Sequence, residues 1–292
     1  MKKQEPLIAI VTPVFNELAH LKIFLRALKR QTFRNVIPII IDAGSSDGSA
    51  EYLEDTKDIE YIKGTPDWWW SHSTNIGISR AKQLGADYVL TINVDVDLAE
   101  DYLDKLVKST SISKHALIGS LVVYRNDPKK VWYAGGTFDE DGMTGHIHGS
   151  VHEFHEPLKA KWLTGMGTLI PIEVFDKAGT YDEKHFPQYF GDSDLSLRAA
   201  EAGYELWVDP KSVVIGDVQS NWVGRQMAKP RLRFYYDLFF SIRSPYQIKT
   251  RYWFYKRHWP TSYRKALWKF YTGPCRYIVV SFTKRLLTRK SK

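Results

Sequence analysis

The chain has 292 residues, of which 43% are hydrophobic, and this suits one large α/β domain with an appendage or two small domains. The chain has one cysteine, Cys275, which excludes an internal disulfide framework. It has no signal-peptide core, and no apolar run approaches the roughly 18 residues of a membrane span. We therefore expect a cytoplasmic protein that is not integral to a membrane. The net charge of +8 comes from residues 221–292, which carry +17, while the rest of the chain carries −9.

The first hundred residues alternate short apolar strands with amphipathic helices. Leucines at 18, 21, 25 and 28, for example, share one face of a helix. We expect strands over 7–12, 36–42, 59–62 and 88–93, and helices over 18–28 and 75–84. This alternation predicts a mostly parallel sheet with right-handed crossovers, in which ligands bind at the carboxyl ends of the strands.

Polar residues gather at those predicted strand ends. Thr12 to Glu17 close the first strand, Asp42 closes the second, and Asn93 to Asp97 follow the fourth. The pattern loosens over 120–160, which holds four histidines between 146 and 155 that we read as a polar loop. A Gly-rich loop at 162–167 then leads into a strand, and Asp192 and Asp194 are expected just before an amphipathic helix.

A change of composition near residue 220 predicts a boundary between a domain at 1–220 and a mainly helical extension at 221–292. The extension has 18 Lys or Arg, one acid (Asp237) and many aromatic residues. Basic and aromatic side chains together suit an anionic membrane surface. They would also suit nucleic acid, a homodimer interface or a solvated appendage. We favour attachment to the inner face of the cytoplasmic membrane and expect no nucleic-acid partner.

Taken in order, these motifs resemble family 2 inverting glycosyltransferases with the GT-A fold, of the bacterial polysaccharide and rhamnosyltransferase-like kind. The resemblance covers roughly residues 6–218. It implies the transfer of a hexosyl or deoxyhexosyl group from a UDP- or dTDP-sugar. The implied acceptor is a hydroxyl of a glycan or lipid-linked glycan in cell-surface polysaccharide synthesis.

The resemblance assigns the donor nucleotide to the first two strand ends. Asp42 would accept a hydrogen bond from the base, although a plain turn residue before Gly44 is the alternative interpretation. The other implied donor-binding residues are Thr12, Pro13, Phe15, Glu17, Asn75 and Asn93. Asn75 is expected near the diphosphate at a helix N-terminus, which is a natural anion site.

A divalent cation, Mg²⁺ or Mn²⁺, is implied by Asn93-Val94-Asp95, which stands at the place of the family's Asp-x-Asp motif. A hard cation held by carboxylate oxygen would neutralise the leaving diphosphate. Asp95 is the predicted ligand and Asp97 the second candidate. Relatives commonly place a metal-binding His where this chain has Gly216-Asp217, so Asp217 is predicted to replace it as an oxygen ligand.

The acceptor side is implied by the second half of the motif set. Asp192 falls on the position of the family's base, although Gly191 replaces a Glu that many relatives carry. Asp194 is assigned to the acceptor side or to orienting the helix that follows. The remaining predicted sugar or acceptor residues are Trp70, Trp162, Thr164 and Gly165. Trp70 belongs to a Trp68-Trp69-Trp70 run, in which at least one ring would stack on a sugar.

Three other functions are weighed against this one. A nucleotidyltransferase that makes the activated sugar shares the general fold, but the chain lacks its Gly-rich basic loop after the first strand. A nucleic-acid-binding protein driven by the basic extension would leave Asp42, Asp95 and Asp192 without a purpose. A degenerate, non-catalytic binding module is the third alternative, because Gly191 and Asp217 depart from the family pattern.

Overall fold

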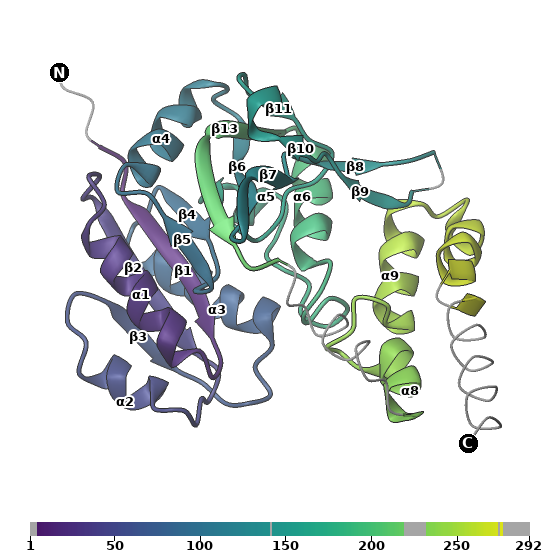
Figure 1. Cartoon of the computed structure of the whole chain (residues 1–292), viewed down its shortest axis with the longest axis horizontal. Coiled ribbons are helices and arrows are strands. Elements are labelled where there is room, and N and C mark those ends of the chain that lie inside the picture. The colour runs from purple at the N-terminus through teal and green to yellow at the C-terminus, as the bar shows by residue number, and fades with distance from the viewer. Residues whose placement is uncertain (1–4, 141, 219–231, 274, 277–292) are drawn as a thin grey trace. The chain divides into compact units, whose positions relative to one another are not determined.

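The computed structural model describes residues 5–140, 142–218, 232–273 and 275–276 (Figure 1). The chain divides into two compact units, each described by itself below. The first unit consists of residues 1–137 and 146–220, and the second consists of residues 138–145 and 221–292. The short internal segment 138–145 therefore belongs to the same unit as the basic C-terminal residues.

In the described residues, one large sheet runs through the first unit in the order β10-β7-β6-β12-β4-β1-β2-β3, with β13 beside β6. Its strands are β1 (Ile8–Val14), β2 (Val36–Asp42), β3 (Glu60–Lys63), β4 (Tyr88–Thr91), β5 (Val96–Leu98), β6 (Ala116–Tyr124), β7 (Asp127–Tyr133), β10 (Gly149–Ser150), β11 (Leu158–Lys159), β12 (Thr168–Pro171) and β13 (Glu205–Gly216). A separate hairpin pairs β8 (Gly136–Phe138) with β9 (Thr144–His146).

Strands β3, β2, β1 and β4 are parallel neighbours, as their alternation with helices predicts. Strand β12 then runs antiparallel between β4 and β6, and the sheet becomes mixed beyond it. The predicted α/β class with a mostly parallel central sheet is thus confirmed. Both faces of β1 and the end of β2 are buried, which explains why these strands are apolar almost throughout.

The helices of the first unit are α1 (Leu18–Lys29), α2 (Ser49–Glu54), α3 (Trp70–Gln83), α4 (Tyr102–Lys108), α5 (Val174–Lys177) and α6 (Gly191–Glu201), with short 3-10 turns η1 (Ser109–Ser111) and η2 (Val151–Glu153). Helix α1 buries the predicted apolar face, including Leu21, Leu25 and Leu28. Helix α3 packs on β1 and β2, and α6 packs on β13.

Helix α3 starts at Trp70, five residues before the predicted start, so the placement of Asn75 at a helix N-terminus is wrong. The first-turn amides of α3 find their acceptors far away in the sequence. The Trp70 amide donates to Gln188 Oε1 at 3.4 Å and the Ser71 amide donates to the Pro187 carbonyl at 2.9 Å. Because these partners come from another loop, local sequence does not reveal them.

The second unit is helical, with α8 (Leu232–Phe240), α9 (Ile248–His258) and a further helical stretch at 263–273. Its own apolar core includes Phe234 and Leu238 of α8, packed by Tyr246. The 138–145 segment packs at the end of α9 in the same unit, since the Phe138 ring lies 4.7 Å from the Trp259 ring, centre to centre. No helix in the described ranges is long and apolar enough to cross a bilayer.

Candidate active site

The ends of β1 and β2 are tied together by one chain of hydrogen bonds. The Asn16 amide donates to Ser45 Oγ at 2.8 Å, and Ser45 Oγ donates to Asp42 Oδ1 at 2.5 Å. Asn16 has a φ of 55°, a conformation that Asn tolerates better than most residues. This network holds the buried Asp42 carboxylate in place and leaves its Oδ2 without a partner in the described chain.

Two neighbouring side chains shape the same strand ends. Phe15 follows β1 and is 42% exposed, which is unusual for a ring of its size in this unit. Glu17 comes just before α1, and its Oε2 lies 2.6 Å from His20 Nδ1. Asp42, Phe15 and Glu17 therefore lie around the two loops that sequence analysis assigns to the nucleotide. Asn16 and Ser45, which organise those loops, were not among the predicted site residues.

A second cluster joins the end of β4 to the Gly-rich loop. The Trp70 indole Nε1 donates to Asn93 Oδ1 at 3.1 Å, and the Trp70 ring lies edge-on to Tyr181 at 5.1 Å between ring centres. A Cβ atom on Gly165 would lie only 2.7 Å from Trp70 Cζ2. Trp70 thus sits between Asn93 and Gly165, two residues predicted to lie on the donor and acceptor sides.

The predicted metal ligands lie at the ends of two paired strands. Strands β5 and β13 are antiparallel and end on the pair Val96 and Gly216, so Asp95 comes directly before this pair and Asp217 directly after it. Arg125 braces this edge because its guanidinium donates to Asp97 Oδ2 and to the Asp95 carbonyl, both at 2.9 Å. Asp97 therefore forms an ion pair with Arg125. A hollow of about 200 Å³ opens here, lined in part by Arg125 and Asp217.

The donor set at this edge fits a cation only if a substrate completes the coordination. No group of three or more His, Cys, Asp or Glu converges in the part of the chain that the structure describes. Asp95 Oδ1, however, is buried without a partner, and burial together with the charge of Glu17 raises the pKa of Asp95. One or two carboxylates plus substrate phosphates form a common Mg²⁺ site, and the buried, unpartnered oxygen of Asp95 fits such a site.

Asp192 lies in the first turn of α6, directly below the Gly-rich loop. Its Oδ2 accepts from the Gly165 amide at 3.0 Å and its Oδ1 accepts from the Ser193 amide at 2.8 Å. Burial raises the pKa of Asp192 despite these hydrogen bonds. A raised pKa moves a carboxylate toward the range in which it can accept a proton during catalysis.

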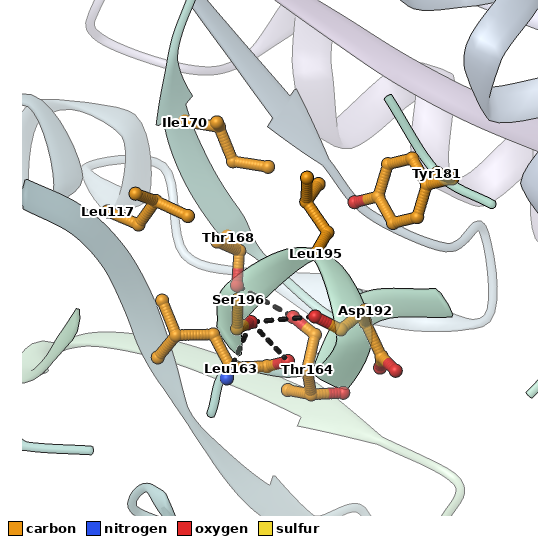
Figure 2. A pocket seen from close by; sticks show the side chains of 9 residues that line it. All are labelled: Leu117, Leu163, Thr164, Thr168, Ile170, Tyr181, Asp192, Leu195 and Ser196. Atoms are coloured by element: carbon orange, nitrogen blue, oxygen red, sulfur yellow. Dashed lines mark hydrogen bonds between the residues drawn. The ribbon is translucent and has the colours of Figure 1, made fainter. Parts of the chain in front are cut away.

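Asp192 is one of the residues that line a cavity of about 10 Å³ (Figure 2). Thr164, Thr168 and Ser196 border it with hydroxyl groups, and Ser196 Oγ is hydrogen-bonded to the backbone of Asp192 and Leu163. A space of this size holds about one water molecule. A sugar does not fit there, so this cavity is not a substrate site.

Gly191 is explained by the packing of two helix starts. A Cβ atom at this position would lie 2.7 Å from Ser71 Oγ in α3 and 3.2 Å from the Tyr181 ring. A larger side chain therefore has no room unless the Ser71 hydroxyl and the Tyr181 ring shift. The residue just before it, Phe190, has a φ of 70°. The departure from the family pattern at Gly191 is therefore explained by helix packing next to Asp192.

Two predicted site residues, Asn75 and Trp162, make contacts that differ from their assigned roles. Asn75 uses its carboxamide to bind the 181–183 loop, donating to the Tyr181 carbonyl and Glu183 Oε2 and accepting from the Tyr181 amide, all at 2.9 Å. Trp162 is buried, and its ring packs against Tyr133 and His146. His146 thus belongs to an aromatic cluster. Burial lowers its pKa.

Asp194 is fully buried, and its Oδ2 accepts from Arg198 Nε at 2.9 Å. Arg198 also donates to the carbonyls of Ala178 and Thr180. Together these contacts fasten helix α6 to the loop before it. They fit the helix-orienting alternative for Asp194 and give it no open surface for an acceptor.

Comparison with known proteins decides the family. The model of "Glycosyl transferase family 2" matches residues 9–169, which is more than half of the chain. The chain belongs to glycosyl transferase family 2. The match spans β1 to β12 and so includes the Asp42, Asn93-Val94-Asp95 and Gly165 positions.

Curated relatives of this glycosyl transferase are bacterial. It is 26% identical to the succinoglycan biosynthesis protein ExoA of Rhizobium meliloti, over 70% of this chain and 62% of that protein. It is 23% identical to the dTDP-rhamnosyl transferase RfbF of Shigella flexneri, over 69% of this chain and 66% of that protein. The chain therefore spans somewhat less than two thirds of the length of these relatives.

Solved structures agree on the fold. GalNAc-T7 with UDP, GalNAc and Mn²⁺ matches with a TM-score of 0.61 and 17% identity, over 74% of this chain and 44% of that one. The mannosyltransferase PcManGT of Pyrobaculum calidifontis, in complex with GDP-Man and Mn²⁺, matches with a TM-score of 0.55 and 16% identity, over 76% of this chain and 61% of that one. At these identities the likeness confirms the predicted GT-A architecture and nothing finer.

The tight contact between Gly165 and Trp70 gives a first testable prediction. Gly165→Ala forces the Trp70 ring away from Asn93, since the new Cβ would lie 2.7 Å from the ring. We expect a loss of about 1–3 kcal/mol in the free energy of unfolding, measured by denaturant titration. Gly273→Ala is the matched control because nothing lies within 4 Å of its Cβ. Equal stability of the two variants would contradict the close packing.

The buried Asp194–Arg198 pair gives a second prediction. Asp194→Ala leaves a largely buried guanidinium without its carboxylate, so we expect a loss of about 3 kcal/mol in unfolding free energy. Asp101→Ala removes an exposed i,i+4 partner of Lys105 and should cost about 0.5 kcal/mol or less. An acceptor-binding role would instead raise the KM for acceptor while leaving stability unchanged.

Proposed function

We propose that this family 2 glycosyltransferase catalyses an inverting transfer of a hexosyl or deoxyhexosyl group from a UDP- or dTDP-sugar to a hydroxyl of a glycan or lipid-linked glycan. Residues 1–220 would carry the reaction. The names of the relatives support this substrate class, since they include a dTDP-rhamnosyl transferase and a succinoglycan biosynthesis protein. An N-acetylglucosaminyl-diphospho-decaprenol L-rhamnosyltransferase of Mycobacterium tuberculosis, 23% identical over 70% of this chain, supports a lipid-linked acceptor.

The observation that carries the proposal is the carboxylate of Asp192. It is fixed by the Gly165 and Ser193 amides, and its pKa is raised by burial, as suits a base. Asp192 takes the proton of the acceptor hydroxyl while that oxygen forms a bond to the anomeric carbon of the donor. The bond between that carbon and the nucleoside diphosphate breaks on the opposite side, so the configuration inverts.

The other site residues bind and orient the donor. Asp42 would accept from the base through its unpartnered Oδ2, while Phe15 offers an exposed ring beside it. Asn93, held by Trp70, would contact the ribose or a bound water. Asp95 and Asp217 would hold Mg²⁺ or Mn²⁺, which supplies positive charge to the leaving diphosphate when bound.

The donor proposal is tested by a thermal-shift panel of UDP, dTDP, GDP, CDP and UMP, with and without Mn²⁺ or Mg²⁺. A ligand that binds only the folded state raises the melting temperature. We expect a shift with UDP or dTDP that the cation enlarges. The absence of any shift with these nucleotides would oppose the transferase proposal and favour a degenerate binding module.

We also propose that the second unit attaches the enzyme to an anionic membrane surface. Its helix α8 buries Phe234 and Leu238 but exposes Tyr236 (63%) and Phe240 (55%), and these two rings stack 4.7 Å apart. Trp268 is 77% exposed in the 263–273 helix. Exposed aromatic rings within a segment of net charge +17 suit the headgroup region of an anionic bilayer.

Liposome flotation of the full chain tests this attachment. We expect binding to vesicles rich in phosphatidylserine at low salt. Replacement of both Tyr236 and Phe240 by Ser should weaken it, while Ile23→Ser, an exposed apolar residue of α1, should not. Equal binding of both variants, or no binding by the native chain, would rule the proposal out.

A further inference from the structure

Three buried polar atoms without hydrogen-bond partners gather on one face of the sheet. Six such side-chain atoms occur among the described residues, and three of them are Thr12 Oγ1, Asp42 Oδ2 and the Tyr61 hydroxyl. Buried polar atoms in folded proteins nearly always have partners, so exceptions point to a missing water or ligand. Tyr61 lies in β3 and was not a predicted site residue.

Strand register places these three residues on the same face of three neighbouring strands. Ile40 of β2 is paired with Thr12 of β1 and with Tyr61 of β3, so Thr12 and Tyr61 share its face of the sheet. Asp42 lies two residues beyond Ile40 and therefore shares that face as well. Across the parallel strands the order of this row is Thr12, Asp42, Tyr61, with the carboxylate on the middle strand, two residues closer to the carboxyl end than its neighbours.

The chemistry of the three groups is also ordered. Asp42 Oδ1 is occupied by Ser45, so Oδ2 is left as a pure acceptor. Burial and the negative charge of Asp42 raise the pKa of Tyr61, which keeps its hydroxyl protonated and able to donate. Thr12 offers a second hydroxyl. The row therefore presents donor, acceptor and donor to a ligand.

We propose that Tyr61 is a base-reading residue of the donor site, which with Asp42 and Thr12 selects the imide edge of uracil or thymine. This proposal rests on the proposed function. The imide edge carries a carbonyl, an N–H and a second carbonyl, which is the complement of the row. Cytosine presents a ring nitrogen acceptor and an amino group instead, and guanine has an amino group in place of one carbonyl.

The test is nucleotide binding by the full chain, measured by calorimetric titration of UDP, dTDP, CDP and GDP into the native protein, Tyr61→Phe and Tyr52→Phe. Tyr52 is the matched control because it lies in α2 with its ring under Lys22. Tyr61→Phe should weaken UDP or dTDP binding about 2- to 10-fold, the usual range for one lost hydrogen bond. Its affinity for CDP and its kcat at saturating donor should stay unchanged.

The outcomes distinguish the role of Tyr61 from the proposed transferase function. Tyr61→Phe that binds every nucleotide like the native protein, or that weakens CDP binding equally, overturns the role of Tyr61. A native preference for GDP or CDP overturns the imide assignment while leaving a transferase in place. Failure of the native protein to bind any nucleoside diphosphate counts against the proposed function itself.

Discussion

Replacing Asp192 by Asn should lower kcat by about 10²-fold or more while leaving donor affinity nearly unchanged. Asn keeps the size of the side chain and can still accept from the Gly165 amide, but it cannot take a proton from the acceptor. The measurement is the steady-state rate with donor and acceptor both saturating. Asp55→Asn, at the exposed end of α2, is the matched control. A normal kcat for Asp192→Asn would exclude Asp192 as the base.

The pH profile sharpens this prediction. Asp192 accepts a proton only when it is ionised, so the rate falls as the pH drops through its pKa. Because burial raises that pKa above the ordinary value of 3.8, the acid limb of kcat/KM should lie above that value. The residual activity of Asp192→Asn should lack this limb. If the same limb persists in the variant, it belongs to another group.

Replacing Asp95 by Asn should abolish the effect of Mn²⁺ on nucleotide thermal shifts and lower kcat by about 10²-fold, since metal charge at a leaving group is worth several kcal/mol. The buried, unpartnered Oδ1 of Asp95 is the atom to which the cation would bind. The thermal shift measures cation binding without turnover, and the initial rate measures its consequence.

The matched control for Asp95 is Asp97→Asn. Asp97 is paired with Arg125, so its replacement should loosen the 95–97 segment without removing the ligand atom. We expect Mn²⁺ to enlarge the nucleotide shift in this variant as it does in the native protein. A loss of the Mn²⁺ effect in Asp97→Asn, with the effect intact in Asp95→Asn, would reverse the assignment of the ligand.

Much of the fold follows from the sequence because its signals are local. Apolar runs and the helical spacing of leucines predict β1, α1, β2 and β4 within a few residues. The order of short motifs around Asp42, Asp95 and Asp192 is enough to predict the family, which the family model confirms. Each of these signals is local because it lies within a single strand, helix or short loop.

What the tertiary structure alone decided is how those residues are used. Asn75 binds a carbonyl 106 positions away, and the Trp70 amide pairs with Gln188 across 118 positions, so the start of α3 could not be read locally. Long-range packing likewise joins Arg198, the partner of Asp194, to the carbonyls of Ala178 and Thr180, and it places Trp162 in an aromatic cluster. Register, which no local pattern reports, puts Asp95 and Asp217 next to the same strand pair and sets Tyr61 on the same face of the sheet as Asp42. The sequence specifies the type of each side chain, but the partners of that side chain depend on which distant segments pack against it.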